Sequence, residues 1–220
     1  MKKAETINKL VLISLFAALA YVCVAVFRIK ISFLTLDLKD AIITVAAMLI
    51  NPVAGIAISV VVSLIEMVTL SDTMLYGFLM NVISTVSFAT VASVIYRAKK
   101  SLYSAILGLV CGVLSMTATM MLANLLITPY YMGVTVDEVV GLIPKLLLPF
   151  NLIKSVINAC IVMIIYKPVS QTLKRAGMKT GDNAESYSFK GKSIVVTLAA
   201  LAVAVICFVI IFKVLGAEIK

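Results

Sequence analysis

Apolar runs separated by short polar breaks repeat along the whole chain. Crossing the roughly 30 Å hydrocarbon core of a bilayer takes about 20 helical residues. The candidate spans are residues 7–27, 40–50, 52–70, 76–96, 102–127, 146–166 and 193–212. The second of these, 40–50, is too short to cross the bilayer alone, so it is either shielded by neighbouring helices or begins deeper in the membrane.

Composition agrees with an all-α integral membrane protein. Hydrophobic residues make up 63% of the chain, charged residues only 13%, and the mean hydropathy is +1.16. The first apolar run continues without a signal-peptidase pattern, so we expect it to remain as a helix. The four cysteines have no C-x-x-C spacing and histidine is absent, which argues against disulfides and against a zinc or haem site.

Basic residues predict the orientation. They precede the first span, follow the fourth, and fill the segment between the sixth and seventh, so all these segments face the cytoplasm if the N-terminus is inside. Twelve of the nineteen basic residues would lie outside in the opposite orientation. The net charge of +9 therefore reflects topology and anionic lipid, and no aromatic-interleaved basic patch suggests nucleic acid.

One face of the sixth span is polar. Asn151, Lys154, Ser155 and Asn158 in "PFNLIKSVIN" share that face at 100° per residue. With the N-terminus inside, this span begins outside, so the stripe lies in the outer half of the membrane. Polar and ionisable side chains in a membrane are costly and usually face a bundle interior or a water-filled cavity.

Three further polar residues are predicted at the same level: Glu66 ends the third span, Asn81 begins the fourth, and Asn124 ends the fifth. Together with the polar stripe they predict a pocket open to the exterior, and we expect Glu66 and Asn158 to contribute to it. The structural alternative is that Lys154 snorkels or pairs with Glu66 while the asparagines only bridge helices.

The first loop, "RIKISFLTLDLKDA", alternates apolar and polar residues although it is predicted to be external. Alternation is typical of an extended segment with one covered face, so this loop is predicted to be a lid across the pocket mouth. Tyr130 and Tyr131, in the loop before the sixth span, are typical of an interfacial belt.

Three segments resemble a known family: "LTLDLKDAIITVAAMLINPVAGIAISVVV", "LANLLITPYYMG" and above all "LPFNLIKSVINACIVMIIYKPVS". They resemble the substrate-binding S component of energy-coupling factor (ECF) vitamin transporters, in particular the riboflavin-specific type. The resemblance covers about the first six spans. It implies a six-helix bundle in a bacterial cell membrane that captures a vitamin and works with a membrane coupling protein and two cytoplasmic ATPases.

The resemblance also implies roles for individual residues. Asn151 and Lys154 match polar contacts of the sixth span, while Thr35 and Leu36 match the lid. The asparagines of the fifth and fourth spans, Asn124 and Asn81, match family positions as well. The family docks on its coupling protein through an alanine-rich ridge of the first span, which here comprises Ser14, Ala17, Ala18 and Ala20.

Two features depart from the riboflavin type. Glu66 and Met67 stand where a lysine followed by an asparagine is more common, which leaves another flavin or vitamin open. The seventh span is additional, so we expect three parts: a vitamin-binding domain (1–173), a polar cytoplasmic connector (174–192), and an extra transmembrane helix with a short tail (193–220).

Two other function classes fit less well. A stand-alone secondary transporter would need a coupling-ion site or a repeat relating its halves, and neither is visible in the sequence. An enzyme would need catalytic partners for Glu66, and no phosphate-binding loop or catalytic triad is present. We therefore expect no catalysis, metal or cofactor in this chain, with riboflavin only as the transported ligand and ATP hydrolysis supplied by partner subunits.

Overall fold

The protein is described here from a computed structural model, which places residues 2–71, 73–176, 192–214 and 218–219. Most of the predicted connector 174–192 lies outside these residues. The helices and strands are α1 (Lys2–Val26), β1 (Arg28–Ile31), β2 (Leu34–Asp37), α2 (Lys39–Leu49), α3 (Pro52–Thr69), α4 (Met74–Lys99), α5 (Leu102–Met132), α6 (Val136–Leu142), the π-helix η1 (Ile143–Leu147), α7 (Leu148–Arg175), α8 (Lys192–Val214) and β3 (Glu218–Ile219).

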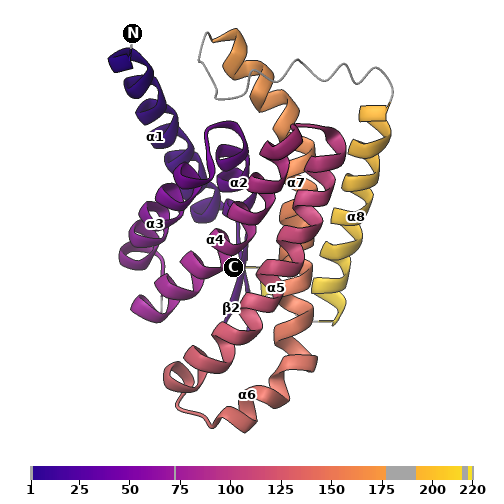
Figure 1. Cartoon of the computed structure of the whole chain (residues 1–220). Coiled ribbons are helices and arrows are strands. Elements are labelled where there is room, and N and C mark those ends of the chain that lie inside the picture. The colour runs from indigo at the N-terminus through magenta and orange to yellow at the C-terminus, as the bar shows by residue number, and fades with distance from the viewer. Residues whose placement is uncertain (1, 72, 177–191, 215–217, 220) are drawn as a thin grey trace.

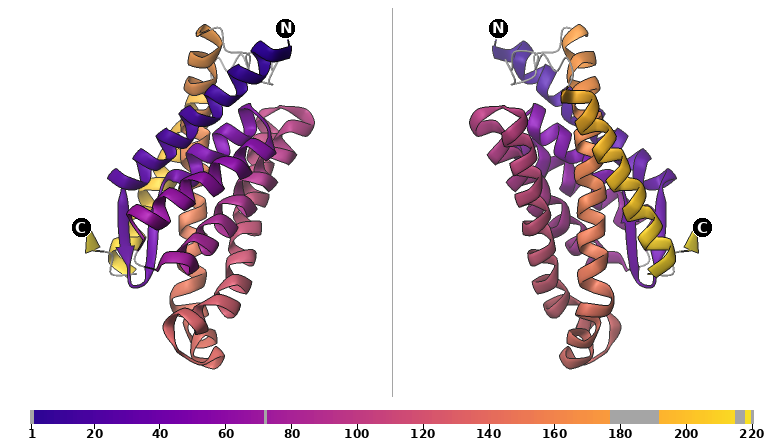
Figure 2. Two further views of the ribbon diagram at one scale, coloured as in Figure 1. Left: turned by 90° about the vertical axis from the view of Figure 1, so that its left-hand side faces the viewer. Right: turned by 90° about the vertical axis from the view of Figure 1, so that its right-hand side faces the viewer.

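The helices form an elongated bundle (Figures 1 and 2). Helix α4 packs along α3 and α5, α5 also contacts α7, and α8 lies on the outer side of α7. In Figure 1 the first turn of α1 and the end of α7 lie at the top, and α6 lies at the bottom. Among the described residues, five segments are long and apolar enough to cross a membrane, and α8 contributes a shorter apolar stretch, Val196–Ile211.

Helix α2 explains the short second span. It has only 11 residues, yet all of them except Ile42 are buried, because α1, α3, α4 and α7 surround it. Of the two alternatives that the sequence left open, shielding by neighbouring helices is the one that the structure bears out. A helix that does not meet lipid does not need the length of a spanning helix.

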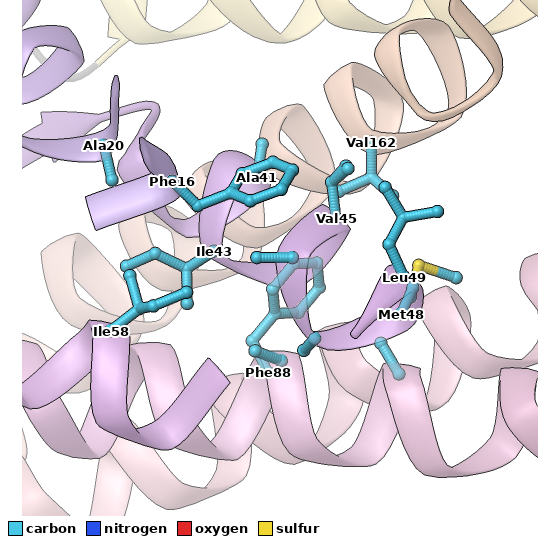
Figure 3. Packing of buried hydrophobic residues seen from close by; sticks show 14 of the residues in the cluster. Phe16, Ala20, Ala41, Ile43, Val45, Met48, Leu49, Ile58, Phe88 and Val162 are labelled. Carbon is cyan, nitrogen blue, oxygen red and sulfur yellow. The ribbon is translucent and has the colours of Figure 1, made fainter. Parts of the chain in front are cut away.

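The main hydrophobic core forms around α2. Figure 3 shows Phe16 of α1, Ile43 of α2, Ile58 of α3 and Phe88 of α4 converging there, with Val162 of α7 at the far side. Lipid chains are as apolar as these side chains, so close packing rather than escape from water must hold the helices together. The many exposed leucines and valines on the outer faces of the helices are consistent with a lipid-facing surface.

The first loop is extended, as its alternation predicted. Strands β1 and β2 form an antiparallel hairpin in which Ile29 pairs with Leu36 and Ile31 with Leu34, and Ser32 takes a positive φ of 56° in the turn. Strand β3 pairs with the other edge of β1. The expected all-α fold is thus a helical bundle with one small sheet added. We call the β1–β2 hairpin the lid.

Basic helix ends gather at one end of the bundle. The last turns of α4 and α7 contain Arg97, Lys99, Lys174 and Arg175, and both helices finish on the side where α1 begins (Figure 1). Arg97 also has a structural partner, since its Nη1 donates to the carbonyl of Ile50 at 3.0 Å. A cation satisfying the last carbonyls of α2 stabilises that helix end.

The close contact between α4 and α5 depends on glycine. A Cβ at Gly108 would lie 2.6 Å from the Ala92 carbonyl oxygen, whereas a Cβ at Gly141 in α6 would meet nothing within 4 Å. We expect Gly108→Ala to lower the free energy of unfolding by about 1–3 kcal/mol through overpacking, measured by thermal unfolding in detergent. Gly141→Ala should be neutral or slightly stabilising, and equal behaviour of the two variants would contradict this packing.

Candidate substrate-binding site

A pocket opens at the end of the bundle opposite the basic helix ends. The space between its walls, counted out into the open solvent at its mouth, is about 770 Å³. The lid contributes Arg28, Phe33, Leu34 and Thr35 to its wall, and α3, α4, α5 and α7 contribute the remainder together with the α3–α4 connection. The wall contains both polar and apolar side chains, as a site for a partly polar organic molecule requires.

Most of the residues singled out from the sequence line this pocket. From four helices and the lid, the structure brings together six predicted residues: Thr35, Glu66, Asn81, Asn124, Asn151 and Lys154. These residues lie up to 119 positions apart in the chain, yet the Lys154 Nζ reaches the Thr35 carbonyl oxygen at 3.4 Å. The clustering expected from membrane depth is therefore present in the structure.

Leu36 and Asn158 do not line the pocket. Leu36 is fully buried in a second apolar cluster beneath the lid. Asn158 lies one turn deeper, where its Oδ1 accepts a hydrogen bond from the backbone N–H of Ala41 at 2.8 Å and its Nδ2 donates to the carbonyl of Asp37 at 3.2 Å. Both residues therefore fix the position of the lid and of α2 and do not contact the cavity, which corrects their assignment to the site.

Lys154 is held by the end of the lid and not by Glu66. Its Nζ lies 2.9 Å from Asp37 Oδ2 and 3.7 Å from Asp40 Oδ2, so it binds across the junction of β2 and α2. Burial alone raises the pKa of the Asp37 carboxyl, but the ammonium groups of Lys154 and Lys39 outweigh burial and hold this pKa below its usual value. Asp37 thus remains ionised as the partner of Lys154.

Glu66 has a different partner. Its carboxylate accepts a hydrogen bond from the Lys39 ammonium, and both side chains are almost completely buried. We call Asp37, Lys39, Asp40, Glu66 and Lys154 the charge cluster. Its charges are largely compensated internally, because three carboxylates face two ammonium groups. Among the described residues, no group of histidine, cysteine or acidic side chains could hold a metal ion.

Sequence reasoning missed three members of the charge cluster. Asp37, Lys39 and Asp40 stand in "LDLKDA", a stretch whose apolar alternation and family resemblance do not indicate how its charges pair. Three charges at the start of a run predicted to enter the membrane were the available signal, since such charges need partners. The complementary partners, Glu66 and Lys154, lay in other spans, and no local pattern connects them.

Two asparagines of the pocket are oriented by their own helices. The Nδ2 of Asn124 donates to the Met120 carbonyl, and the Nδ2 of Asn151 donates to the Leu147 carbonyl, at 2.7 and 2.8 Å. Thr128 donates to Asn124 Oδ1. Such local bonds hold the amides in one orientation before any ligand arrives, which lowers the entropic cost of binding.

Further wall residues carry unused hydrogen-bonding atoms. The Ser84 hydroxyl and Arg28 Nε are buried without a hydrogen-bond partner among the described residues, and both residues line the pocket. Buried polar atoms usually have partners, so these two are available to a ligand. Sequence reasoning missed both, because a serine within an apolar helix and an arginine at a strand start are common.

Three aromatic rings that line the pocket lie close to one another. The ring of Tyr131 lies 6.2 Å from that of Phe33 at the tip of the lid and 6.3 Å from that of Tyr76 at the start of α4, centroid to centroid. These separations are those of attractive aromatic pairs. The tyrosine pair expected at the interface is therefore divided: Tyr131 lines the pocket, whereas Tyr130 is 79% exposed.

The predicted docking ridge of α1 is only partly available. Ser14 and Ala18 are exposed, and Ala17 is half-buried. Ala20 is fully buried in the main core, because it lies on the face of α1 that packs against α2 and α3. A surface for another helix could therefore include Ser14 and Ala18, and Ala20 is excluded from it.

Comparison with known proteins identifies the class of this chain. The family model described as "ECF transporter, substrate-specific component" matches residues 8–166, which is most of the chain. The protein therefore belongs to the ECF transporter S-component family. It is a multi-pass membrane protein and a substrate-binding transporter subunit, and its family is one of transport components, not of enzymes.

Individual relatives agree with the family. The chain is 29% identical over 179 residues to the riboflavin transporter RibU of Staphylococcus aureus (strain TCH60), covering 76% of this chain and 93% of that protein. A solved structure described as "Structure and mechanism of the S component of a bacterial ECF transporter" matches with a TM-score of 0.66 and 29% identity. That match covers 77% of this chain and 99% of the other.

Removing Lys154 tests the charge cluster. Lys154→Met leaves buried carboxylates without their nearest cation, so we expect the free energy of unfolding to fall by about 3–5 kcal/mol, measured by thermal unfolding in detergent. Lys145→Met is the matched control because Lys145 is exposed. Adding Asp37→Asn to Lys154→Met should restore part of the loss. Wild-type stability of Lys154→Met would contradict the assigned pairing.

Proposed function

We propose that this protein captures riboflavin, or a closely related flavin, from outside the cell for ATP-driven uptake. The observation that carries the proposal is the lidded pocket, where amide side chains, aromatic rings and an apolar wall surround one cavity. Similarity to a riboflavin transporter over most of both chains supports the ligand. A flavin ring needs an apolar slot with amide-like hydrogen-bond partners, and its ribityl chain needs polar partners for its hydroxyls.

The pairing of Lys154 favours a neutral ligand over an anion bound by this ammonium group. Lys154 and Glu66 line the cavity, but each is already paired within the charge cluster, and Arg28 is the third charged residue of the wall. An anionic ligand such as a nucleotide would have to displace Asp37 from Lys154, at the cost of a buried unpaired carboxylate. The neutral hydrogen-bonding groups, above all Asn81, Asn124 and Asn151, are the natural partners of an uncharged flavin.

We further propose an N-terminus in the cytoplasm. The basic ends of α4 and α7 lie at the end of the bundle where α1 begins, which the positive-inside rule assigns to the cytoplasm. The pocket and lid are at the other end and would then face the exterior. This is the arrangement that capture from outside requires.

Uptake on this proposal needs partners: a membrane coupling protein and two cytoplasmic ATPases. The chain has no phosphate-binding loop of its own, and its family is the substrate-specific component of a larger transporter. The exposed Ser14 and Ala18 of α1 provide a face where a second membrane helix could approach closely. Release of the ligand inward would follow when the partners stabilise a state with lower affinity.

Ligand binding is tested by titrating the purified protein with riboflavin and following quenching of flavin fluorescence, which the absence of tryptophan simplifies. We expect saturable quenching by the wild type. Asn81→Ala and Asn151→Ala should each weaken binding about tenfold, the cost of about 1.4 kcal/mol when a hydrogen bond is lost. Asn8→Ala, an exposed position in α1, should bind as the wild type does.

Two other outcomes would be decisive. Absence of riboflavin binding by a folded, monodisperse protein would exclude the ligand, and other vitamins would then be screened against the same variants. Loss of affinity in Asn8→Ala as large as in the pocket variants would exclude the assigned site.

Docking is tested by adding bulk to α1. We expect Ala18→Trp to leave riboflavin affinity unchanged but to lower ATP-dependent uptake at least about tenfold, because a large side chain prevents close helix approach. Uptake would be measured in vesicles containing the coupling protein and both ATPases. Ala118→Trp, at an exposed position of α5, is the matched control. Equal uptake by the two variants would reject the docking face, and uptake without ATPases would favour a stand-alone transporter.

A further inference from the structure

Helix α8 lies outside the part of the chain that defines the family. The family match ends at residue 166, and α8 begins at Lys192. The helix packs along α7 and follows it on the outside of the bundle (Figures 1 and 2). Its position relative to the lid suggests what it does there.

The last two turns of α8 belong to the same apolar cluster as the lid. Cys207 and Ile211 are buried, and Phe208 is partly buried, in one apolar cluster. The same cluster contains Ile29, Ile31 and Leu36 of the lid, together with Phe150, Ile153 and Ile157 of α7. We call this cluster the lid seam.

Two further contacts join the same parts. The ring of Phe208 meets that of Phe27, immediately before the lid, edge to face with centroids 6.0 Å apart. Beyond α8, β3 pairs antiparallel with β1, with Ile219 opposite Ile29. Side-chain packing and strand pairing thus connect the C-terminal segment of the chain to the same strand of the lid.

The lid needs such support. An isolated two-stranded hairpin is marginally stable at best and requires packing against another element. One face of this hairpin carries Ile29, Ile31 and Leu36 into the seam, while Thr35 and the tip residue Phe33 line the pocket. Packing against the apolar face of the lid therefore also determines the position of the part of the pocket wall that the lid forms.

We propose that α8 supports the lid in its closed position. Phe208 and Ile211 are positioning residues that hold the hairpin closed and thereby slow the opening of the pocket. Neither residue lines the cavity. Opening of the lid separates its apolar face from α8, so a smaller side chain in the seam weakens the closed state and favours the open one. The consequence for the ligand rests on the proposed function, but the movement of the lid itself does not.

Lid opening is measured without ligand, by the labelling rate of Thr35→Cys with a maleimide in the purified full-length protein. Ile211→Ala should raise this rate about tenfold, which corresponds to about 1.4 kcal/mol. The matched control is Ile210→Ala, whose side chain is 37% exposed and lies outside the lid seam, so this substitution should leave the rate unchanged. The same variants without Thr35→Cys measure the background labelling of the four native cysteines.

Phe208 provides a graded second test. Phe208→Ala should also accelerate labelling, and Phe208→Leu should restore most of the slow rate because it refills the seam. Gly108→Ala, which affects the distant α4–α5 contact, separates lid opening from general destabilisation and should not accelerate labelling below its melting temperature. If Ile211→Ala does not remain monodisperse, the labelling rates of Phe208→Ala and Phe208→Leu decide whether α8 holds the lid closed.

Equal labelling rates for Ile211→Ala and Ile210→Ala, or for Phe208→Ala and wild type, would overturn the proposal. A second arm follows riboflavin dissociation, which should accelerate about as much as labelling in the seam variants. If riboflavin does not bind at all, its assignment as the ligand is rejected, while the labelling experiment still decides whether α8 holds the lid closed.

Discussion

Charge burial in a medium without water is the constraint on which this structure depends. Five ionisable side chains of the charge cluster are almost fully removed from solvent, and each requires a partner because an unpaired charge in a membrane is costly. The pairing joins separate parts of the chain: Lys154 ties α7 to the end of the lid, and Lys39 ties α2 to Glu66 of α3. Satisfying these charges brings together the elements that enclose the pocket.

The position of α2 follows from the same constraint. Its first turn is anchored by Asn158 of α7, its last carbonyls by Arg97 of α4, and its sides by the apolar core. Helix α2 is thus held at both ends and along its length in the centre of the surrounding helices. The pocket wall can then combine fixed amides on long helices with one thin element, the lid, whose support comes from packing on α7 and α8.

Local patterns in the sequence predicted part of the pocket wall, and for a physical reason. Asn151 and Lys154 are one helical turn apart, so their shared face follows from helix geometry, and alternation in the first loop follows from strand geometry. Leu36 and Asn158 show the limit of such reasoning. Asn158 has the right depth and Leu36 belongs to the lid, but which neighbours each meets depends on the packing of other elements, and neither lines the cavity.

The sequence by itself determined the class of protein and its multi-pass helical character. Long apolar runs can satisfy their backbone hydrogen bonds only as helices in lipid, and the polar residues within them had to face one another. Only the tertiary structure decided that Lys154 pairs with Asp37 and not with Glu66, that Ala20 is in the core, and that α8 shares an apolar cluster with the lid. These contacts join residues far apart in the chain, and the packing of helices, which no local pattern contains, selects the partners.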